Sequence, residues 1–161
     1  MTPDFQEFVL ARKGHSFEEF AVGQRYVHHW GRTITEADNV MFSTGLCFWN
    51  PMQLNAEYAH AHGHPGVVVN PMLVCCVAVG LSVEDLSEAG GMFVGIDDCD
   101  FVRPVYVGDT ITSVSTVTST RGSASRPDFG IVGWATEASN QRGETVLTLR
   151  RTNLVIREAA R

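Results

Sequence analysis

The sequence predicts an α+β fold in which one curved antiparallel β-sheet wraps a long apolar helix. Two observations predict it. Residues 72–81 read MLVCCVAVGL and are apolar on every face, so a helix formed there must be enclosed by other parts of the protein. The second half of the chain holds four long segments rich in Val, Ile, Thr and Phe with turn signals between them, which is the pattern of an antiparallel meander. Packed together, such a helix and sheet bury each other's apolar faces.

Length and charge limit what the chain can be. Its 161 residues, 44% of them hydrophobic and 19% charged, fit one compact domain, which we expect to span 1–161 with a core over about 16–157. The formal charge of -6 gives no field that attracts nucleic acid or an anionic membrane, so we expect neither as a partner. The longest apolar run, 72–81, is far shorter than the roughly 20 residues of a membrane-spanning helix.

Cysteine usage and the N-terminus indicate the compartment. The cysteines at 47, 75, 76 and 99 show no CxxC pair and no regular disulfide spacing, so we expect free thiols in a reducing environment. Cys75 and Cys76 are expected to be buried in the apolar helix. Residues 1–17 lack the basic start and long apolar stretch of a signal peptide. The predicted location is the cytoplasm.

The segment before the apolar helix begins with a strand and a short helix. Residues 24–32 mix aromatic and β-branched side chains as a strand does. Thr33 and Glu36 have the spacing of a capping box, which predicts a helix running to about Thr44. Residues 45–51, GLCFWNP, contain Gly, Asn and Pro that break the helical period, so they predict a structured loop.

Two asparagines mark the next two helix starts. Asn55 is expected to cap a second short helix over 55–62. Asn70 is expected to cap the apolar helix, because Pro71 follows at the first helical position, where a missing N–H costs nothing. The apolar helix is therefore predicted to begin at Pro71.

The remaining segments predict the sheet. The last strand carries polar residues on both faces, so we expect one face to meet water or another subunit. A curved sheet around one helix is the hotdog fold, and a single copy leaves an edge strand and part of the helix uncovered. We therefore predict a homodimer or a higher homo-oligomer. The expected strands are 92–105, 110–120, 130–140 and 144–157.

Several motifs connect the chain to a known family. With NPMQ at 50–53, VNPM at 69–72 and RPVYVGD at 103–109, the chain resembles the MaoC-like hydratases and dehydratases over about 16–156. The stretches GRTITEADN and NQRGETVLTLRRTNLV are most similar to the branch that hydrates mesaconyl-CoA and itaconyl-CoA. The resemblance implies a hotdog fold and an acyl thioester of CoA or an acyl carrier protein as the substrate.

The resemblance also implies a mechanism that this chain cannot follow in its usual form. In the family, a loop reading D-x-N-P-[LIV]-H activates a water, and a backbone N–H at the start of the central helix polarises the thioester carbonyl. Here Phe48 stands at the Asp position, Gln53 at the His position and Pro71 at the glycine that supplies the N–H. Phenylalanine exchanges no proton, glutamine is no base near pH 7, and proline has no N–H.

The remaining polar groups near this loop are the candidate catalytic residues. Asn50 and Gln53 are expected to orient water or the carbonyl, with His64 supplying the proton step. The alternatives for that step are two other histidines, His60 and His62, and the aspartates at 97, 98 and 100. Alternate histidines on a helix face different directions, so we expect no metal site, and no cofactor is implied.

Apolar and polar residues around the helix start are the candidate substrate-binding residues. The expected acyl groove is lined by Phe48, Trp49, Met52, Asn70 and Met72. Three arginines, at 103, 150 and 151, either bind CoA phosphates or pair across the sheet.

The sequence leaves three functions open. The first is a hydratase or dehydratase, a lyase acting on an enoyl-CoA or acyl-carrier-protein thioester through a non-standard site. The second is a non-catalytic hotdog subunit that binds the thioester and works with a competent hotdog partner. The third keeps the pocket and changes the reaction to thioester hydrolysis or a biosynthetic rearrangement.

Overall fold

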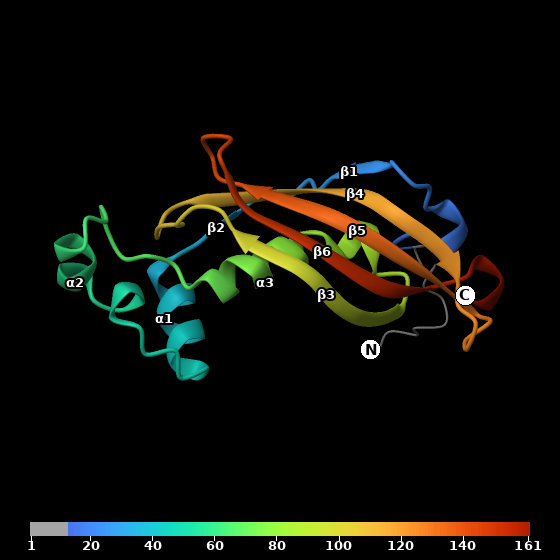
Figure 1. The fold of residues 1–161 in the computed structure, drawn as a ribbon, viewed down its shortest axis with the longest axis horizontal. Helices are drawn as coiled ribbons and strands as arrows, with labels where there is room; N and C mark the ends of the chain where they lie inside the picture. The colour runs from blue at the N-terminus through green and yellow to red at the C-terminus, as the bar shows by residue number, and fades with distance from the viewer. Residues whose placement is uncertain (1–12) are drawn as a thin grey trace, which may run out of the picture.

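A computed structural model describes residues 13–161, so most of the N-terminal stretch that entered the compartment prediction lies outside the described residues. The helices α1 and α2 lie beyond one end of the sheet, where α3 begins (Figure 1). No helix among the described residues has the length and apolarity to cross a membrane. In chain order the elements are η2 (Phe17–Glu19), β1 (Arg25–Val27), β2 (Arg32–Thr33), α1 (Glu36–Gly45), η3 (Pro51–Gln53), α2 (Ala56–Ala61), α3 (Pro71–Leu81), α4 (Val83–Leu86), β3 (Gly91–Phe101), β4 (Thr110–Gly122), β5 (Phe129–Ser139), β6 (Thr145–Ile156) and η4 (Glu158–Ala160).

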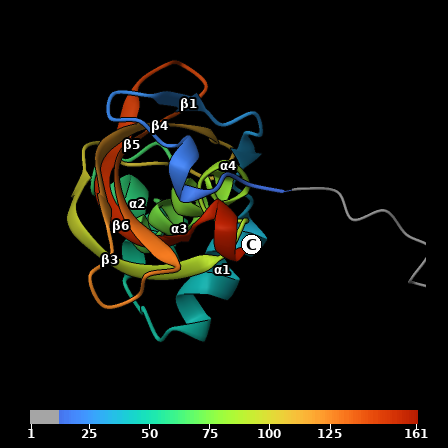
Figure 2. The ribbon, with the colours of Figure 1, turned by 90° about the vertical axis from the view of Figure 1, so that its right-hand side faces the viewer.

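The strands form one antiparallel sheet in the order β1-β4-β5-β6-β3, with β2 paired to the first residues of β4. The sheet curves around α3 and α4 (Figure 2). The predicted hotdog fold is confirmed. The prediction of a simple four-strand meander was wrong for β3, which pairs with β6 at the far edge. The connection from β3 to β4 passes the start of α3, where Val69 N donates to Val105 O at 2.8 Å.

The central helix is enclosed on one side only. Its residues Leu73, Val74 and Ala78 are buried in a core with Ile111 and Leu147 of the sheet. The opposite face is open, because Met72, Cys76 and Gly80 are exposed. The prediction that a single copy leaves part of the helix uncovered is confirmed, whereas the prediction that Cys76 is buried was wrong for the single chain. A curved sheet can cover only one side of a cylinder.

The predicted strand over 24–32 is two short strands with an inward turn between them. His28, directly after β1, still donates its backbone N–H to Ser113 O of β4 at 3.1 Å. Its side chain is buried, at 3% exposure, with Nδ1 2.6 Å from Asp85 Oδ2 and Nε2 2.9 Å from Ser115 Oγ. These bonds tie the first strands to α4 and to the inner face of β4. The buried imidazole explains the break, because its polar atoms find partners only on the inner face of the sheet.

The start of α1 lies two residues later than predicted. The capping box is formed by Thr35 and Asp38, with Asp38 N donating to Thr35 Oγ1 at 3.2 Å and Thr35 N to Asp38 Oδ2 at 2.9 Å. Thr33 is held in β2 instead, and its hydroxyl lies 2.7 Å from that of Thr110. Sheet pairing thus keeps Thr33 extended and moves the cap. The predicted caps at Asn55 and Asn70 are confirmed.

One buried arginine lies on the inner face of β6. Arg151 is 1% exposed and its guanidinium carbon lies 5.4 Å from the centre of the Trp134 ring. Its Nε and Nη2 have no hydrogen-bond partner within the described chain. Burial lowers the pKa of Arg151 to about 10. Arg150, its neighbour, is exposed on the outer face, and the ion pairs among residues 13–161 include neither arginine, so the alternative of cross-strand pairing is not seen for them.

We predict that Arg151→Met stabilises the protein. A buried charge without a counter-ion loses its hydration and gains no ion pair, whereas methionine fills a similar volume beside Trp134. The free energy of unfolding, measured by chemical denaturation, should rise by about 1–4 kcal/mol. The matched control Arg150→Met, on the exposed face, should change it by less than about 0.5 kcal/mol. A lower stability for Arg151→Met than for the control would contradict this account.

Candidate functional site

The predicted loop, α1 and the start of α3 meet at one buried side chain, Asn39. This residue of α1 is fully buried. Its Nδ2 donates to Gln53 O at 2.8 Å, and its Oδ1 accepts from Asn70 N at 2.8 Å. No sequence pattern had singled out Asn39. The signal that could have found it is the polar pair Asn39 and Ser43, which lie four residues apart and therefore share one helix face.

Asn70 is engaged entirely inside the protein. Its Oδ1 accepts from Met72 N at 3.0 Å, and its Nδ2 donates to Ser43 Oγ at 3.2 Å. The residue is fully buried. Capping the helix uses Oδ1, the bond to Ser43 uses Nδ2, and the side chain is fully buried, so the predicted substrate-binding role of Asn70 is not supported.

The side chain of Gln53 carries a buried oxygen that has no hydrogen-bond partner in the described chain. Its side chain is 6% exposed, and Oε1 has no hydrogen-bond partner in the described chain. Asn50, by contrast, is exposed and caps η3, because its Oδ1 accepts from Met52 N at 3.0 Å. A buried carbonyl oxygen without a partner is rare and costly, so Gln53 Oε1 keeps an unused acceptor. Gln53 lines neither of the two apolar cavities that flank α3.

The apolar residues of the loop lie on the surface. Phe48 and Trp49 are 44% and 70% exposed, Met72 is 42% exposed and Met52 is half-buried. Cys47 has a φ of 58°, which turns the chain at the end of α1 and lets Phe48 N donate to Ser43 O at 2.8 Å. These side chains form an exposed apolar edge beside Gln53.

Two apolar cavities flank α3, and other residues line them. One, of about 240 Å³, lies between the start of α3 and the end of β3, against Pro71, Val74 and Phe101. The other, of about 430 Å³, follows the open face of α3 along Leu73 and Cys76. None of the five residues predicted to line the acyl groove lines either cavity: Phe48, Trp49, Met52, Asn70 and Met72.

The three histidines do not converge. His60 Nε2 lies 3.1 Å from Pro65 O, and His62 Nδ1 lies 2.8 Å from Tyr58 O. His64 Nδ1 lies 3.0 Å from the Tyr106 hydroxyl. The structure thus joins His64 to Tyr106, and no contact links it to Gln53 or Asn50. Among residues 13–161 no group of three or more His, Cys, Asp or Glu side chains could hold a metal ion.

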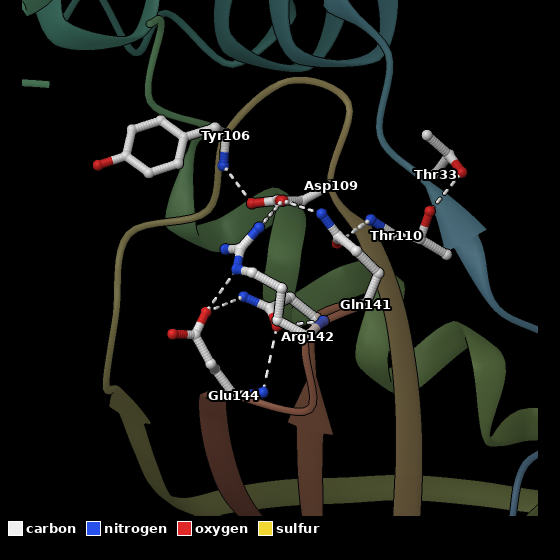
Figure 3. A network of polar contacts seen from close by, with 8 residues as sticks. Thr33, Tyr106, Asp109, Thr110, Gln141, Arg142 and Glu144 are labelled. Carbon is white, nitrogen blue, oxygen red and sulfur yellow. Dashed lines mark hydrogen bonds and ion pairs between the residues drawn. The ribbon is translucent and has the colours of Figure 1, made fainter. Parts of the chain in front are cut away.

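Tyr106 is itself held by a polar network (Figure 3). The buried Asp109 accepts from Tyr106 N at 2.9 Å and from Gln141 Nε2 at 2.7 Å. Arg142 Nη1 lies 3.3 Å from the same carboxylate, and Arg142 Nε donates to Glu144 at 2.8 Å. Hydrogen bonds from Asn140 and Arg142 lower the pKa of Glu144. The network fixes the loop before β4 to the turn between β5 and β6.

The aspartates lie on the wrong side of the sheet to act at α3. Asp98 and Asp100 line a hollow of about 510 Å³ on the outer face, together with Arg150. Asp97 accepts from the Thr152 hydroxyl at 3.3 Å. Arg103 remains close to the helix start, where it lines the smaller cavity and donates to Thr145 O at 3.1 Å.

The four cysteines are free thiols. Burial, together with a smaller effect of its neighbour Cys99, raises the pKa of the Cys75 thiol to about 12. A thiol with so high a pKa is protonated at neutral pH and is a poor nucleophile. Cys47 and Cys76 are exposed.

Comparison with known proteins places this geometry in a family. The model of the mesaconyl-CoA hydratase family matches residues 6–161. The chain belongs to that family. The mesaconyl-CoA hydratase of Haloarcula hispanica is 38% identical over 146 residues, which cover 90% of this chain and 41% of that protein. This hotdog domain is therefore MaoC-like, as the sequence motifs predicted.

Solved structures agree on the fold. A MaoC domain protein dehydratase from Chloroflexus aurantiacus superposes with a TM-score of 0.85 at 28% identity, covering 90% of this chain and 41% of that chain. A conserved protein of Mycobacterium tuberculosis, described as a double hotdog fold, superposes with a TM-score of 0.80 at 23% identity, covering 90% and 45%. The chain spans about two fifths of the length of the curated mesaconyl-CoA hydratases that it matches.

We predict that Asp109→Ala destabilises the protein by about 2–3 kcal/mol, because it leaves the Tyr106 N–H and the Gln141 amide without an acceptor. Asp109→Asn keeps one acceptor oxygen and should cost less. Glu144→Ala, which removes an exposed partner of the same Arg142, should lower the free energy of unfolding less than either. Chemical denaturation of the three variants checks the order, and equal losses for Asp109→Ala and Glu144→Ala would contradict it.

Proposed function

We propose that this chain is the acyl-thioester-binding hotdog domain of a hydratase or dehydratase that acts on an enoyl-CoA with a small branched or dicarboxylic acyl group, such as mesaconyl-CoA. The supporting observation is the buried Gln53 Oε1, unpartnered in the described chain, at the family's water-activating position. The family match supports the reaction class, and the apolar cavities beside α3 offer room for an acyl group. Four free thiols support a reducing compartment, the cytoplasm.

The chemistry needs a water or hydroxide at the β-carbon, a proton at the α-carbon and donors toward the developing enolate. Gln53 Oε1 can accept from the attacking water and orient it, but it cannot take the proton. The start of α3 offers no donor to the carbonyl, since Pro71 has no N–H and the N–H groups of Met72 and Leu73 are bonded to Asn70. The proton donor must therefore come from another residue or another domain.

The missing proton-transferring group can come from another residue of this chain. His64 and Tyr106 form a hydrogen-bonded pair of titratable groups, both half-buried, beside the segment that leads to α3. Tyr106 is paired in the sheet-like bridge with Val68, two residues before Asn70. We propose His64 as the proton-transferring residue of a single-chain site, with Asn50 and Gln53 orienting the substrates.

The other source is a second hotdog domain. The edge strand β3 exposes Met92, Phe93, Val94 and Ile96, which are 41–58% exposed. An unpaired edge with apolar side chains is a ready surface for another strand. We propose that a second hotdog domain pairs with β3, supplied by a second copy of this chain or by a different hotdog chain. If that domain carries the acid and base, this chain serves as a binding subunit.

We predict measurable hydration activity that depends on Gln53. Purified protein should consume mesaconyl-CoA or crotonyl-CoA, followed as loss of the conjugated thioester absorbance. Gln53→Ala should lower kcat by roughly tenfold to a hundredfold, because the water loses its positioning partner. Asn55→Ala, which removes the exposed cap of α2, should leave turnover unchanged.

The same assay distinguishes a chain that carries its own catalytic groups from a binding subunit whose partner supplies them. Saturable binding of butyryl-CoA without turnover supports the binding-subunit function. Neither binding nor turnover of any of these thioesters would contradict the proposed function.

We predict that Val94→Lys weakens pairing at β3. Val94 is 58% exposed on the edge strand, where a lysine charge opposes a second strand. The mass measured by light scattering should fall to that of one chain, whereas Thr118→Lys, an exposed position on the inner strand β4, should leave it unchanged. A wild-type protein that is monomeric at micromolar concentration would contradict pairing of two copies.

A further inference from the structure

We infer that Asn39 is the positioning residue of the thioester site, an inference that rests on the proposed function. Its side chain spans the two parts of the site that come from distant segments, Gln53 in the loop and Asn70 at the start of α3. Both hydrogen bonds are 2.8 Å long. A third contact, from Nδ2 to Val68 O at 3.5 Å, reaches the segment leading into α3.

The geometry requires an amide at this position. Asn39 donates to one backbone carbonyl and accepts from one backbone N–H, on opposite atoms of a single short side chain. An aspartate carboxylate could accept from Asn70 N but would face Gln53 O with a second acceptor. A leucine could do neither, although it has a similar volume. Among the described residues, no charged side chain contacts Asn39 to compensate such a change.

These bonds act on the backbone and leave the Gln53 side chain available. Asn39 holds Gln53 by its carbonyl oxygen, while Gln53 Oε1 keeps no partner in the described chain. Asn39 is fully buried and Gln53 is 6% exposed, so water does not replace these bonds if Asn39 is changed. One backbone bond also joins the two segments, from Val68 N to Met52 O at 3.1 Å. Asn39 adds the bonds to Gln53 O and Asn70 N, and so contributes to the place of a water or substrate oxygen on Gln53.

Asn39→Asp tests the inference without changing the shape of the side chain. At pH 8 the carboxylate repels Gln53 O, and kcat on mesaconyl-CoA should fall by roughly tenfold or more while KM changes less than about threefold. At pH 5.5 the buried carboxyl should be protonated and donate again to Gln53 O, since burial without a cation raises the pKa of an introduced aspartate. The ratio of variant to wild-type kcat should then recover.

Two controls separate positioning from folding. Asn39→Leu removes both bonds and should show the loss of kcat without any recovery at pH 5.5. Ser43→Ala removes only the bond from Asn70 Nδ2 and should change the kcat ratio by less than about threefold at both pH values. The folded fraction of each variant, measured by circular dichroism under assay conditions, corrects each kcat for unfolded protein.

Different results would overturn the positioning role of Asn39 and the proposed function. A folded Asn39→Asp with wild-type kcat at pH 8, or a loss that equals its unfolded fraction, would overturn the positioning role. A loss at pH 8 without recovery at pH 5.5 would overturn the claim that the bond to Gln53 O carries the effect. A wild-type protein that neither turns over the enoyl-CoA substrates nor binds butyryl-CoA would overturn the proposed function itself, and the inference with it.

Discussion

A single curved sheet cannot enclose a helix, and the rest of this structure depends on that constraint. The inner face of α3 is buried against the sheet, while Met72, Cys76 and Gly80 lie open on the opposite face. The same geometry leaves β3 as an unpaired edge with exposed apolar side chains. Both surfaces are expensive to leave in water.

The second constraint is the burial of polar backbone at the start of α3. A helix start packed inside protein must satisfy its N–H groups internally. Here Asn70 caps the helix, Pro71 removes one donor and Asn39 accepts from Asn70 N. The consequence is chemical as well as structural. With its donors used or absent, this helix start has no backbone N–H left to polarise a carbonyl.

A third feature ties the site to the sheet. Because β3 lies at the far edge, its connection to β4 must cross the end of the sheet near the start of α3. Asp109 anchors that connection to the turn between β5 and β6, and Tyr106 on the same loop reaches His64. Residues far apart in sequence, 64, 106 and 141, thus become one rigid assembly. The hydrogen-bonded pair of His64 and Tyr106 depends on it.

The amino-acid sequence by itself determined the local features of this protein. Apolar residues on every face identified α3, side-chain chemistry identified the caps Asn55 and Asn70, and motifs identified the MaoC-like family. These features depend on residues that lie close together in the sequence. Tertiary structure alone decided which polar groups remain free. Asn39 and Gln53 lie fourteen residues apart, and only packing of α1 against η3 shows that one serves the backbone while the other keeps an unpartnered oxygen. Likewise, only the curvature of the sheet shows that Cys76 is exposed, because sequence reports the polarity of a residue and not which of its neighbours will cover it.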